Sequence, residues 1–286
     1  MTNWLKAIFI NALLIMSTIG TVFGAYQLIF SFGQGTTIPW LASTIATGTV
    51  CYIFFIYIGR GGVARTSENL NAASAIVLLC ALISLFYISS VPLATFYAAG
   101  IAGIGLALYL FWYSSFGRKT GLLSIGSKLP AFSLGQTSGE LLWSSDLSKP
   151  SLIIFFRGNW CPLCVAQVEE VVVQYQRLQA LGVEVYFVSP QPQQESEKLA
   201  KRFSAPVNFC VDNDNAAARI LGIDHPRGLP LGMEAMGYDA DIVMPTVIIL
   251  DQQGDIAYLD ETDNYRVRPE PDIYFQVFEK MGLAKS

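Results

Sequence analysis

Charged side chains are scarce in this chain: they make up 14% of its 286 residues, whereas hydrophobic residues make up 52%. A typical soluble domain has about a quarter charged residues. The shortage falls on residues 1–117, whose few charged side chains are Lys6, Arg60, Arg65 and Glu68. With a net charge of −4, the composition argues against a wholly soluble globule, a disordered chain and a basic nucleic-acid binder.

Long uncharged stretches predict a membrane region. Residues 7–59 and 69–117 contain no Asp, Glu, Lys, Arg or His. One bilayer crossing takes about 20 apolar residues, so each stretch has room for two helices joined by a turn. Buried hairpins in a soluble protein are the alternative, but helices of soluble proteins keep a polar stripe. We therefore predict four membrane-spanning helices, near residues 7–30, 39–59, 71–91 and 94–116.

The positions of lysine and arginine predict the orientation of these helices. The residues concerned are Lys6 before the first helix, Arg60 and Arg65 between the second and third, and Arg118 and Lys119 after the fourth. Loops that carry Lys and Arg stay in the cytoplasm. We therefore expect a multi-pass protein of a bacterial-type inner membrane, with the lipid bilayer as a partner and both termini in the cytoplasm. The absence of charge inside the spans argues against an ion or proton pathway.

After residue 121 the pattern changes to strands that alternate with helices. Short apolar runs predict strands, and apolar residues three and four apart predict helices. The predicted strands are 151–156, 183–188, 207–211, 246–250 and 255–259. The predicted helices are 162–181, 193–203, 214–221 and 271–282. This order predicts a mixed sheet with helices on both faces. The predicted division is a membrane domain (1–117), a linker (118–128) and an α/β domain (129–286).

Two cysteines, Cys161 and Cys164, lie where the predicted strand 151–156 leads into the predicted helix 162–181. The N–H groups and the positive dipole end at the start of a helix stabilise a thiolate. Pro162 suits the first helical position because it has no N–H to leave without a partner. A Cys-x-x-Cys pair in this context predicts a redox site.

Other uses of the cysteines stay open as alternatives. A structural zinc site takes about four ligands, and beyond the pair this part of the chain offers only Cys210 and His225. A permanent disulfide is disfavoured in the reducing cytoplasm. Copper transfer that uses the pair and His225 is a third alternative. Free cysteine packs well as a small apolar residue, and we interpret Cys51, Cys80 and Cys210 in this way.

Residues 126–281 resemble the thioredoxin-fold redoxins of the alkyl hydroperoxide reductase/thiol-specific antioxidant (peroxiredoxin-like) family, in its CxxC-bearing branch. The residues that carry the resemblance are 129–134, 160–164, 182–185, 188–189, 244–246, Asp251, Gly254 and 264–271. The resemblance implies a thioredoxin-like α/β fold and a cis-proline at Pro245 that faces the cysteine pair. It also implies a substrate groove, formed by Trp160, Pro162, Pro245 and Thr246.

The cysteine motif departs from the peroxiredoxin pattern. With Cys164 placed on the family's peroxidatic cysteine, Arg157 stands where the family has proline, and Cys161 stands where it has Thr or Ser. Ala257 replaces the arginine that the family has beyond the hairpin glycine. The candidates for the missing cation are Arg157, then Arg266 and Arg268.

These features predict a membrane-anchored thiol oxidoreductase and antioxidant that cycles Cys161 and Cys164 between dithiol and disulfide. In a thioredoxin-like reaction, Cys161 attacks a protein disulfide and Cys164 resolves the mixed disulfide. In a peroxidase reaction, a hydroperoxide oxidises Cys164 and Cys161 condenses with the sulfenic acid. Both reactions need a thiol electron donor but no metal, flavin or nucleotide cofactor. The alternatives are a non-enzymatic redox sensor and a copper-delivery or other metal-delivery protein.

Overall fold

The computed structural model describes every residue except 1, 119–121, 204 and 284–286. The chain forms two compact units. The helical unit comprises Met1–Gly61 and Thr66–Ser115, and the sheet unit comprises Gly62–Arg65 and Phe116–Ser286. Lys119, which served to predict the orientation, and the neighbouring part of the predicted linker lie outside the described residues.

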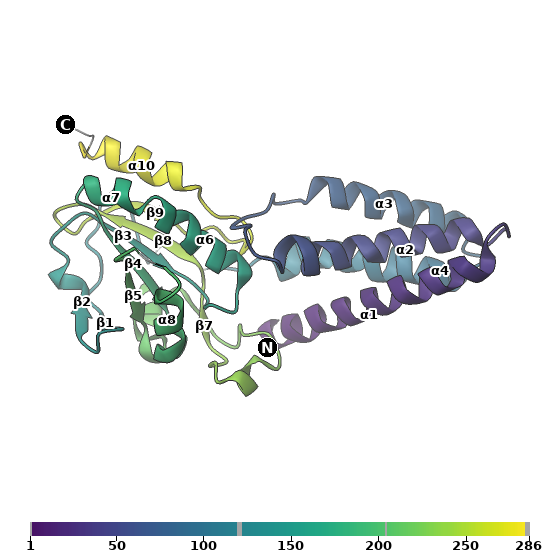
Figure 1. The fold of residues 1–286 in the computed structure, drawn as a ribbon, viewed down its shortest axis with the longest axis horizontal. Coiled ribbons are helices and arrows are strands. Elements are labelled where there is room, and N and C mark those ends of the chain that lie inside the picture. The colour runs from purple at the N-terminus through teal and green to yellow at the C-terminus, as the bar shows by residue number, and fades with distance from the viewer. Residues whose placement is uncertain (1, 119–121, 204, 284–286) are drawn as a thin grey trace. The chain divides into compact units, whose positions relative to one another are not determined.

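The helical unit consists of apolar helical runs (Figure 1). Its elements are α1 (Thr2–Ser31), α2 (Thr37–Cys51) with the π-helical extension η1 (Tyr52–Ile58), α3 (Asn71–Phe86), and a last run composed of α4 (Pro92–Thr95), η2 (Phe96–Ile104), α5 (Gly105–Leu108) and η3 (Tyr109–Tyr113). Within the described residues, three runs are long and apolar enough to cross a membrane: Asn3–Phe30, Thr37–Ile58 and Pro92–Tyr113.

The third predicted span, 71–91, differs from the structure. The helix α3 ends at Phe86 and has 16 residues, fewer than the roughly 20 that one crossing needs. Tyr87 leaves the helical conformation, and a tight turn follows in which Ser90 N–H donates to Tyr87 O (3.0 Å). Pro92 then opens the last run, and the residue before a proline disfavours the helical conformation. Three of the four predicted spans therefore have the length to cross a bilayer.

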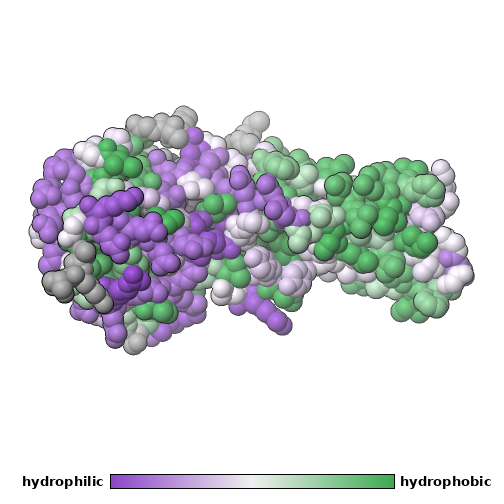
Figure 2. Space-filling view, turned by 90° about the horizontal axis from the view of Figure 1, so that it is seen from above, coloured by the Kyte–Doolittle hydropathy of each residue, from purple (hydrophilic) through white to green (hydrophobic). Residues whose placement is uncertain are grey.

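Small residues allow close helix packing in this unit. A Cβ added at Gly20 would lie 2.7 Å from the ring of Tyr97, and one at Gly105 would lie 2.5 Å from Leu13. Large apolar side chains are instead exposed on the outside, among them Leu78, Leu79, Leu82 and Phe86. Figure 2 shows hydrophobic residues gathered over the visible face of this unit. Close backbone contact beneath an apolar exterior is typical of helices that pack in lipid.

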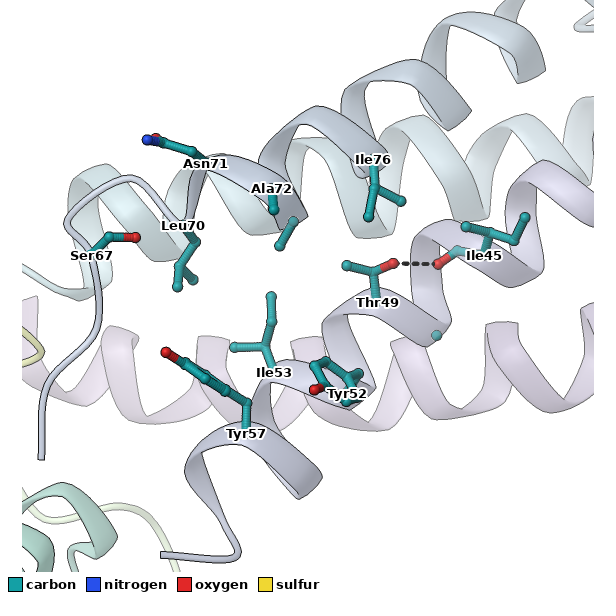
Figure 3. A pocket seen from close by; sticks show the side chains of 12 residues that line it. Ile45, Thr49, Tyr52, Ile53, Tyr57, Ser67, Leu70, Asn71, Ala72 and Ile76 are labelled. Carbon is teal, nitrogen blue, oxygen red and sulfur yellow. Dashed lines mark hydrogen bonds between the residues drawn. The ribbon is translucent and has the colours of Figure 1, made fainter. Parts of the chain in front are cut away.

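An apolar cavity of about 610 Å³ lies within the helical unit, between η1 and α3. Ile53 and Leu70 point into this cavity, and Tyr57 and Ser67 flank one end of it (Figure 3). No charged side chain is among the described residues that line it. Its chemistry suits a hydrocarbon chain, so it offers nothing that would activate a thiol or a peroxide.

The sheet unit contains a seven-stranded sheet in the order β2-β1-β5-β4-β3-β8-β9. Its strands are β1 (Ser133–Gln136), β2 (Leu141–Trp143), β3 (Ser151–Phe155), β4 (Glu184–Ser189), β5 (Asn208–Val211), β8 (Thr246–Leu250) and β9 (Ile256–Asp260). The strands β3, β4 and β5 run parallel, and the other pairs are antiparallel. The predicted mixed sheet is confirmed.

Short elements account for most differences from the predicted pattern. The strands β1 and β2 and the separate pair β6 (Asp224–His225) and β7 (Ile242–Val243) have two to four residues each, too few to show an alternating pattern. The predicted helix 162–181 is interrupted at Gln174, whose ψ is 2°. The helices are α6 (Pro162–Val173), α7 (Tyr175–Ala180), α8 (Gln193–Ala200), α9 (Ala216–Leu221) and α10 (Pro271–Lys280).

The central strand β3 is buried along its whole length. Ile153 and Phe155 belong to a buried cluster that includes residues of α9. Leu152 and Ile154 point to the opposite face because side chains alternate along a strand. The helices α6 and α10 are neighbours, since Gln167 of α6 donates to the hydroxyl of Tyr274 of α10 (3.3 Å) (Figure 1). The chain therefore leaves the middle of the sheet at Phe155 and enters α6 after a short loop, which is where the predicted cysteine pair lies.

Candidate active site

The loop between β3 and α6 places both predicted cysteines at the start of α6. Cys161 is the N-cap residue, Pro162 is the first helical residue and Cys164 is the third. Their Sγ atoms lie 2.7 Å apart, and both are free thiols. Only 4% of Cys161 and 0% of Cys164 is exposed. The two sulfurs can therefore form a disulfide without unwinding the helix, shielded from bulk water.

The backbone before the pair is held in a fixed shape. Gly158 has a φ of +143°, and a Cβ there would lie 2.7 Å from Nε1 of Trp160. Asn159 N–H donates to Oε1 of Gln191 (2.7 Å), and the Tyr238 hydroxyl donates to Oδ1 of Asn159 (2.6 Å). Trp160, predicted as a groove residue, is thus fixed by close backbone contact at the entrance to α6.

Arg268 is the charged residue that contacts the pair directly. Its Nη2 donates to Sγ of Cys164 (3.3 Å), its Nη1 to Oε1 of Gln167 (2.7 Å) and its Nε to the carbonyl of Tyr265 (3.3 Å). Only 5% of Arg268 is exposed. A guanidinium held in this way favours the charged form of the sulfur that it faces. The sequence pointed to Arg157 first; the signal for Arg268 was its place within the matching stretch 264–271.

Arg157, the predicted cation, lies close to the pair without bonding to it. Its Cζ is 4.9 Å from the centre of the Trp160 ring and 5.4 Å from that of Tyr265. Its Nη2 donates to the carbonyl of Gly228 (3.0 Å). Stacking on aromatic faces stabilises a guanidinium that is largely withdrawn from water. Arg157 therefore supplies positive charge near the sulfurs and also ties the loop before α6 to the segment after β6.

The electrostatics of the pair favour a thiolate on Cys164. Burial alone would raise the pKa of Cys164, but the hydrogen bond with Cys161 and the positive charges of Arg268 and Arg157 hold this pKa well below its usual value. Burial, the hydrogen bond with Cys164 and the negative charge on Cys164 raise the pKa of the Cys161 thiol well above its usual value. These effects favour the negative charge on Cys164 and the proton on Cys161.

Residues 125–259 match the AhpC/TSA family. This part of the chain is an AhpC/TSA domain. The family and the mixed sheet give the sheet unit a thioredoxin-like, peroxiredoxin-like fold, and they place the domain among thiol peroxidases and oxidoreductases. A comparison with curated proteins found no match.

Solved structures similar to the chain are peroxiredoxins of low sequence identity. The Mycobacterium tuberculosis peroxidoxin BcpB is 16% identical with a TM-score of 0.46, and the match covers 57% of this chain and 99% of that one. A peroxiredoxin-like protein from Aquifex aeolicus is 16% identical with a TM-score of 0.48, over 57% and 90% of the two chains. Reduced Vibrio vulnificus Prx3 in complex with hydrogen peroxide is 17% identical with a TM-score of 0.48, over 55% and 99%.

The predicted groove residues of the AhpC/TSA domain divide into two places. Trp160 and Pro162 flank Cys161, whereas Pro245 and Thr246 line a separate cavity of about 10 Å³ that Arg268 also lines. The described residues contain no cis peptide bond, so the expectation of a cis-proline at Pro245 is wrong. The trans isomer is the ordinary one, favoured by about 0.5–1 kcal/mol at bonds that precede proline.

Arg118 lies over Pro245 and Thr246. Its Nη1 donates to Oγ1 of Thr246 (3.0 Å), and its Nη2 donates to the carbonyl of Pro245. The backbone N–H of Arg118 donates to Oδ1 of Asp263 (2.8 Å). The segment that follows the apolar helices therefore occupies the polar groups of Pro245 and Thr246. Nothing in the sequence pattern had indicated this contact.

The other cysteines and the single histidine lie apart from the pair. Cys210 is part of the buried cluster beneath α9, and burial raises its pKa to about 12. The ring of His225 packs edge-on against Phe116, with centroids 5.3 Å apart. Among the described residues, no group of three or more His, Cys, Asp or Glu is arranged to hold a metal ion. Cys210 thus has the surroundings of a packing residue.

Proposed function

We propose that this protein is a membrane-anchored thiol peroxidase in which Cys164 is the residue oxidised by a hydroperoxide and Cys161 is the resolving residue. The observation that carries the proposal is the Arg268 guanidinium, which donates to the buried Sγ of Cys164 at 3.3 Å. The charge that lowers the pKa of Cys164 lies beside the reacting sulfur, and such preorganised charge is a common source of catalysis.

The reaction follows from the two protonation states. The Cys164 thiolate attacks one oxygen of the hydroperoxide, the O–O bond breaks, and the leaving alkoxide or hydroxide takes up a proton. Cys164 is then a sulfenic acid. The sulfur of Cys161 attacks it, the disulfide forms, and water leaves with the Cys161 proton. One hydroperoxide and two thiols thus yield one disulfide, one alcohol and one water. A thiol donor restores the pair by exchange.

The site favours a small oxidant over a protein disulfide. A thioredoxin-like reductase needs Cys161 as a thiolate, but the pKa of Cys161 is raised by burial and by its hydrogen bond with Cys164. The carbonyl of Pro245 is already engaged by Arg118. These contacts support a hydroperoxide as the first substrate.

Peroxide kinetics on the full-length protein in detergent micelles test the assignment of the two cysteines. We expect Cys164→Ser to reduce the rate of oxidation by hydrogen peroxide at least about a thousandfold, because the reacting sulfur is gone. Cys161→Ser should still react once and accumulate a sulfenic acid that dimedone traps on Cys164. Cys80→Ser in the helical unit is the matched control. Retained peroxide reactivity in Cys164→Ser, together with its loss in Cys161→Ser, would reverse the assignment.

Membrane anchoring and the cytoplasmic orientation belong to the same proposal. They are supported by three apolar runs of sufficient length and by the positions of Arg60, Arg65 and Arg118 next to those runs. In spheroplasts, external protease should leave the AhpC/TSA domain uncut, whereas inverted vesicles should expose it. Cleavage of the domain in intact spheroplasts would place it on the opposite side of the membrane.

A further inference from the structure

Arg65 contacts the sheet unit at two points, Glu170 and Pro269. It belongs to the segment Gly62–Arg65, which is part of the sheet unit although it lies between η1 and α3 in the chain. Its Nη1 donates to Oε1 of Glu170 (3.2 Å), its Nη2 donates to Oε2 of the same carboxylate, and its Nη2 also reaches the carbonyl of Pro269 (3.4 Å). A two-pronged pair of this kind fixes geometry as well as charge.

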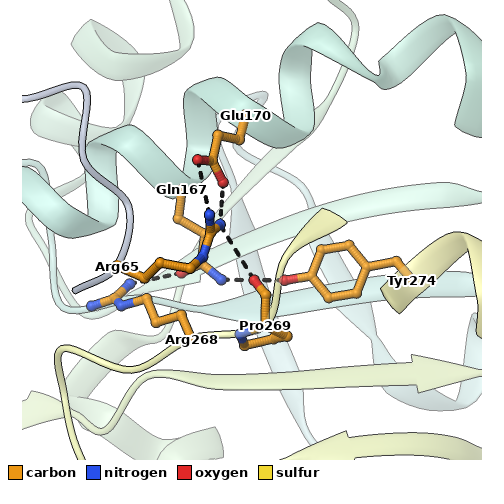
Figure 4. A network of polar contacts seen from close by, with 6 residues as sticks. All are labelled: Arg65, Gln167, Glu170, Arg268, Pro269 and Tyr274. Carbon is orange, nitrogen blue, oxygen red and sulfur yellow. Dashed lines mark hydrogen bonds and ion pairs between the residues drawn. The ribbon is translucent and has the colours of Figure 1, made fainter. Parts of the chain in front are cut away.

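The two points that Arg65 joins are next to the residues that hold the thiolate. Pro269 directly follows Arg268 in the chain. Glu170 lies three residues after Gln167 on α6, so the two share one face of that helix, and Gln167 accepts a hydrogen bond from Arg268 (2.7 Å). Figure 4 shows Arg65 between Glu170 and Pro269, with Gln167 and Arg268 beside them.

The segment that carries Arg268 is also held at its beginning. Phe116 N–H donates to the carbonyl of Asp263 (2.9 Å), and Arg118 N–H donates to the Asp263 carboxylate (2.8 Å). Phe116 and Arg118 follow the last apolar run, and Arg65 follows the second. Both ends of the stretch 263–269 are therefore attached to chain segments that flank the apolar helices.

We propose that Arg65 is a positioning residue that holds Arg268 against Cys164 by tying Pro269 to Glu170, so that the connection between the second and third apolar helices sets the reactivity of the thiol. The proposal rests on the assignment of Cys164 as the nucleophile. Its physical basis is that a charge–thiolate contact weakens as the two groups separate. Loss of the tie at Pro269 lets the neighbouring guanidinium move away from the sulfur.

The pH dependence of Cys164 alkylation measures directly whether Arg65 affects the pKa of Cys164. The groups that face Cys164 are Cys161, Arg268 from the stretch 263–269, Arg157 from the loop after β3 and, through Gln167, Tyr274 of α10. Arginine keeps its charge across the usable pH range, and burial raises the pKa of Tyr274. The alkylation midpoint therefore reports the cysteine pair and the position of its arginines.

The experiment uses the full chain in micelles, with iodoacetamide as probe and mass spectrometry to follow Cys164 alone between pH 4 and pH 10. We expect Arg65→Gln to raise the midpoint by about one pH unit, the lower end of what a displaced opposite charge produces. At pH values below the midpoint of the unaltered protein, alkylation should then be about tenfold slower. Arg65→Lys, which keeps the charge and one prong, should restore part of the shift. Arg60→Gln, an exposed arginine in the same connection, is the matched control.

The possible outcomes separate the inference from the proposed function. If Cys164 of the unaltered protein titrates like an ordinary thiol, the assignment of the nucleophile fails. If the midpoint of Cys164 lies below that of an ordinary thiol, but Arg65→Gln shifts this midpoint no more than Arg60→Gln does, only the role of Arg65 fails. Glu170→Gln removes the charge of the other partner with little change in shape. It covers the case in which Arg65→Gln does not fold, and an unchanged midpoint there would overturn the inference.

Discussion

The helical unit and the sheet unit both contain buried or half-buried cysteines, but among the described residues a charged side chain hydrogen-bonds to a cysteine sulfur in the sheet unit alone. In the helical unit, Sγ of Cys51 lies 3.8 and 3.7 Å from the hydroxyls of Thr18 and Thr21. In the sheet unit, Sγ of Cys164 accepts a hydrogen bond from the guanidinium of Arg268. A fixed cation favours the thiolate. The difference in function therefore comes from the neighbours of the sulfur rather than from its burial.

The two units also differ in the burial of their arginine side chains. The arginine of the helical unit is Arg60, which lies outside the apolar runs, whereas the sheet unit buries Arg157, Arg266 and Arg268 to between 0% and 7% exposure. Withdrawing an ion from water costs several kcal/mol unless a partner offsets it. A negative sulfur offsets part of this cost at Arg268. The thiolate and the buried guanidinium therefore stabilise each other.

Removal of the Arg268 cation should have the largest effect, because it takes away the charge that distinguishes the surroundings of Cys164 from those of Cys51. Reactivity rises with pH through the pKa of Cys164 and then levels off, because the thiolate is the nucleophile. Arg268→Gln should raise that pKa and lower the rate of peroxide oxidation at pH 6 by about 10- to 100-fold, with a smaller loss at pH 9. Stopped-flow rates across this pH range provide the measurement.

Arg157→Gln supplies the graded comparison for Arg268. Because Arg157 stacks on rings and does not bond to the sulfur, its removal should shift the pH profile in the same direction by a smaller amount. A larger shift from Arg157→Gln than from Arg268→Gln would show that the direct hydrogen bond is not the controlling contact.

A smaller effect is expected when a glycine that allows close packing is replaced by alanine. Gly158 and Gly20 are such glycines, one from each unit. Gly158→Ala would set a Cβ 2.7 Å from the Trp160 ring nitrogen at a positive φ, and we expect it to lower the free energy of unfolding of the sheet unit by about 1–3 kcal/mol. Gly20→Ala would meet Tyr97 at 2.7 Å and should destabilise the helical unit alone. Thermal unfolding, followed by near-UV circular dichroism together with the peroxide rate, separates the two units.

Gly139 is the control for backbone strain without a clash. It has a φ of +90° and no atom within 4 Å of the added Cβ, so Gly139→Ala should cost only about 1 kcal/mol. Equal losses for Gly139→Ala and Gly158→Ala would mean that the contact with Trp160 contributes nothing to the shape of the loop.

Much of the architecture was predictable because it depends on local pattern. The buried strands β3 and β8 follow from short apolar runs, and the pair Cys161 and Cys164 follows from its spacing at the start of a helix. The apolar helices follow from the absence of charge. The turn after Phe86 makes α3 shorter than the predicted span 71–91. The helix break at Gln174 left no comparable pattern in the sequence.

The charged half of the site was less predictable because it depends on long-range packing. Arg268 reaches Cys164 across 104 positions of the chain, and Arg65 reaches Glu170 across 105. Neither contact follows from the spacing of residues, since each depends on how an irregular segment folds back against α6. The stretch 264–271 resembled the family without indicating which of its arginines faces the sulfur. Pro245, assigned by resemblance alone, has the ordinary trans bond.

The burial of Cys164 also determines where electrons re-enter the site. A protein or peptide thiol is too large to reach a sulfur with 0% exposure, whereas Cys161 keeps 4% at the surface. In the proposed cycle, the incoming donor attacks Cys161 and forms its mixed disulfide there, which makes Cys164 the leaving group. A thiol of low pKa leaves faster in such exchanges. The cycle thus has two separate entrances, with the small oxidant arriving at the hidden sulfur and the bulky reductant at its neighbour.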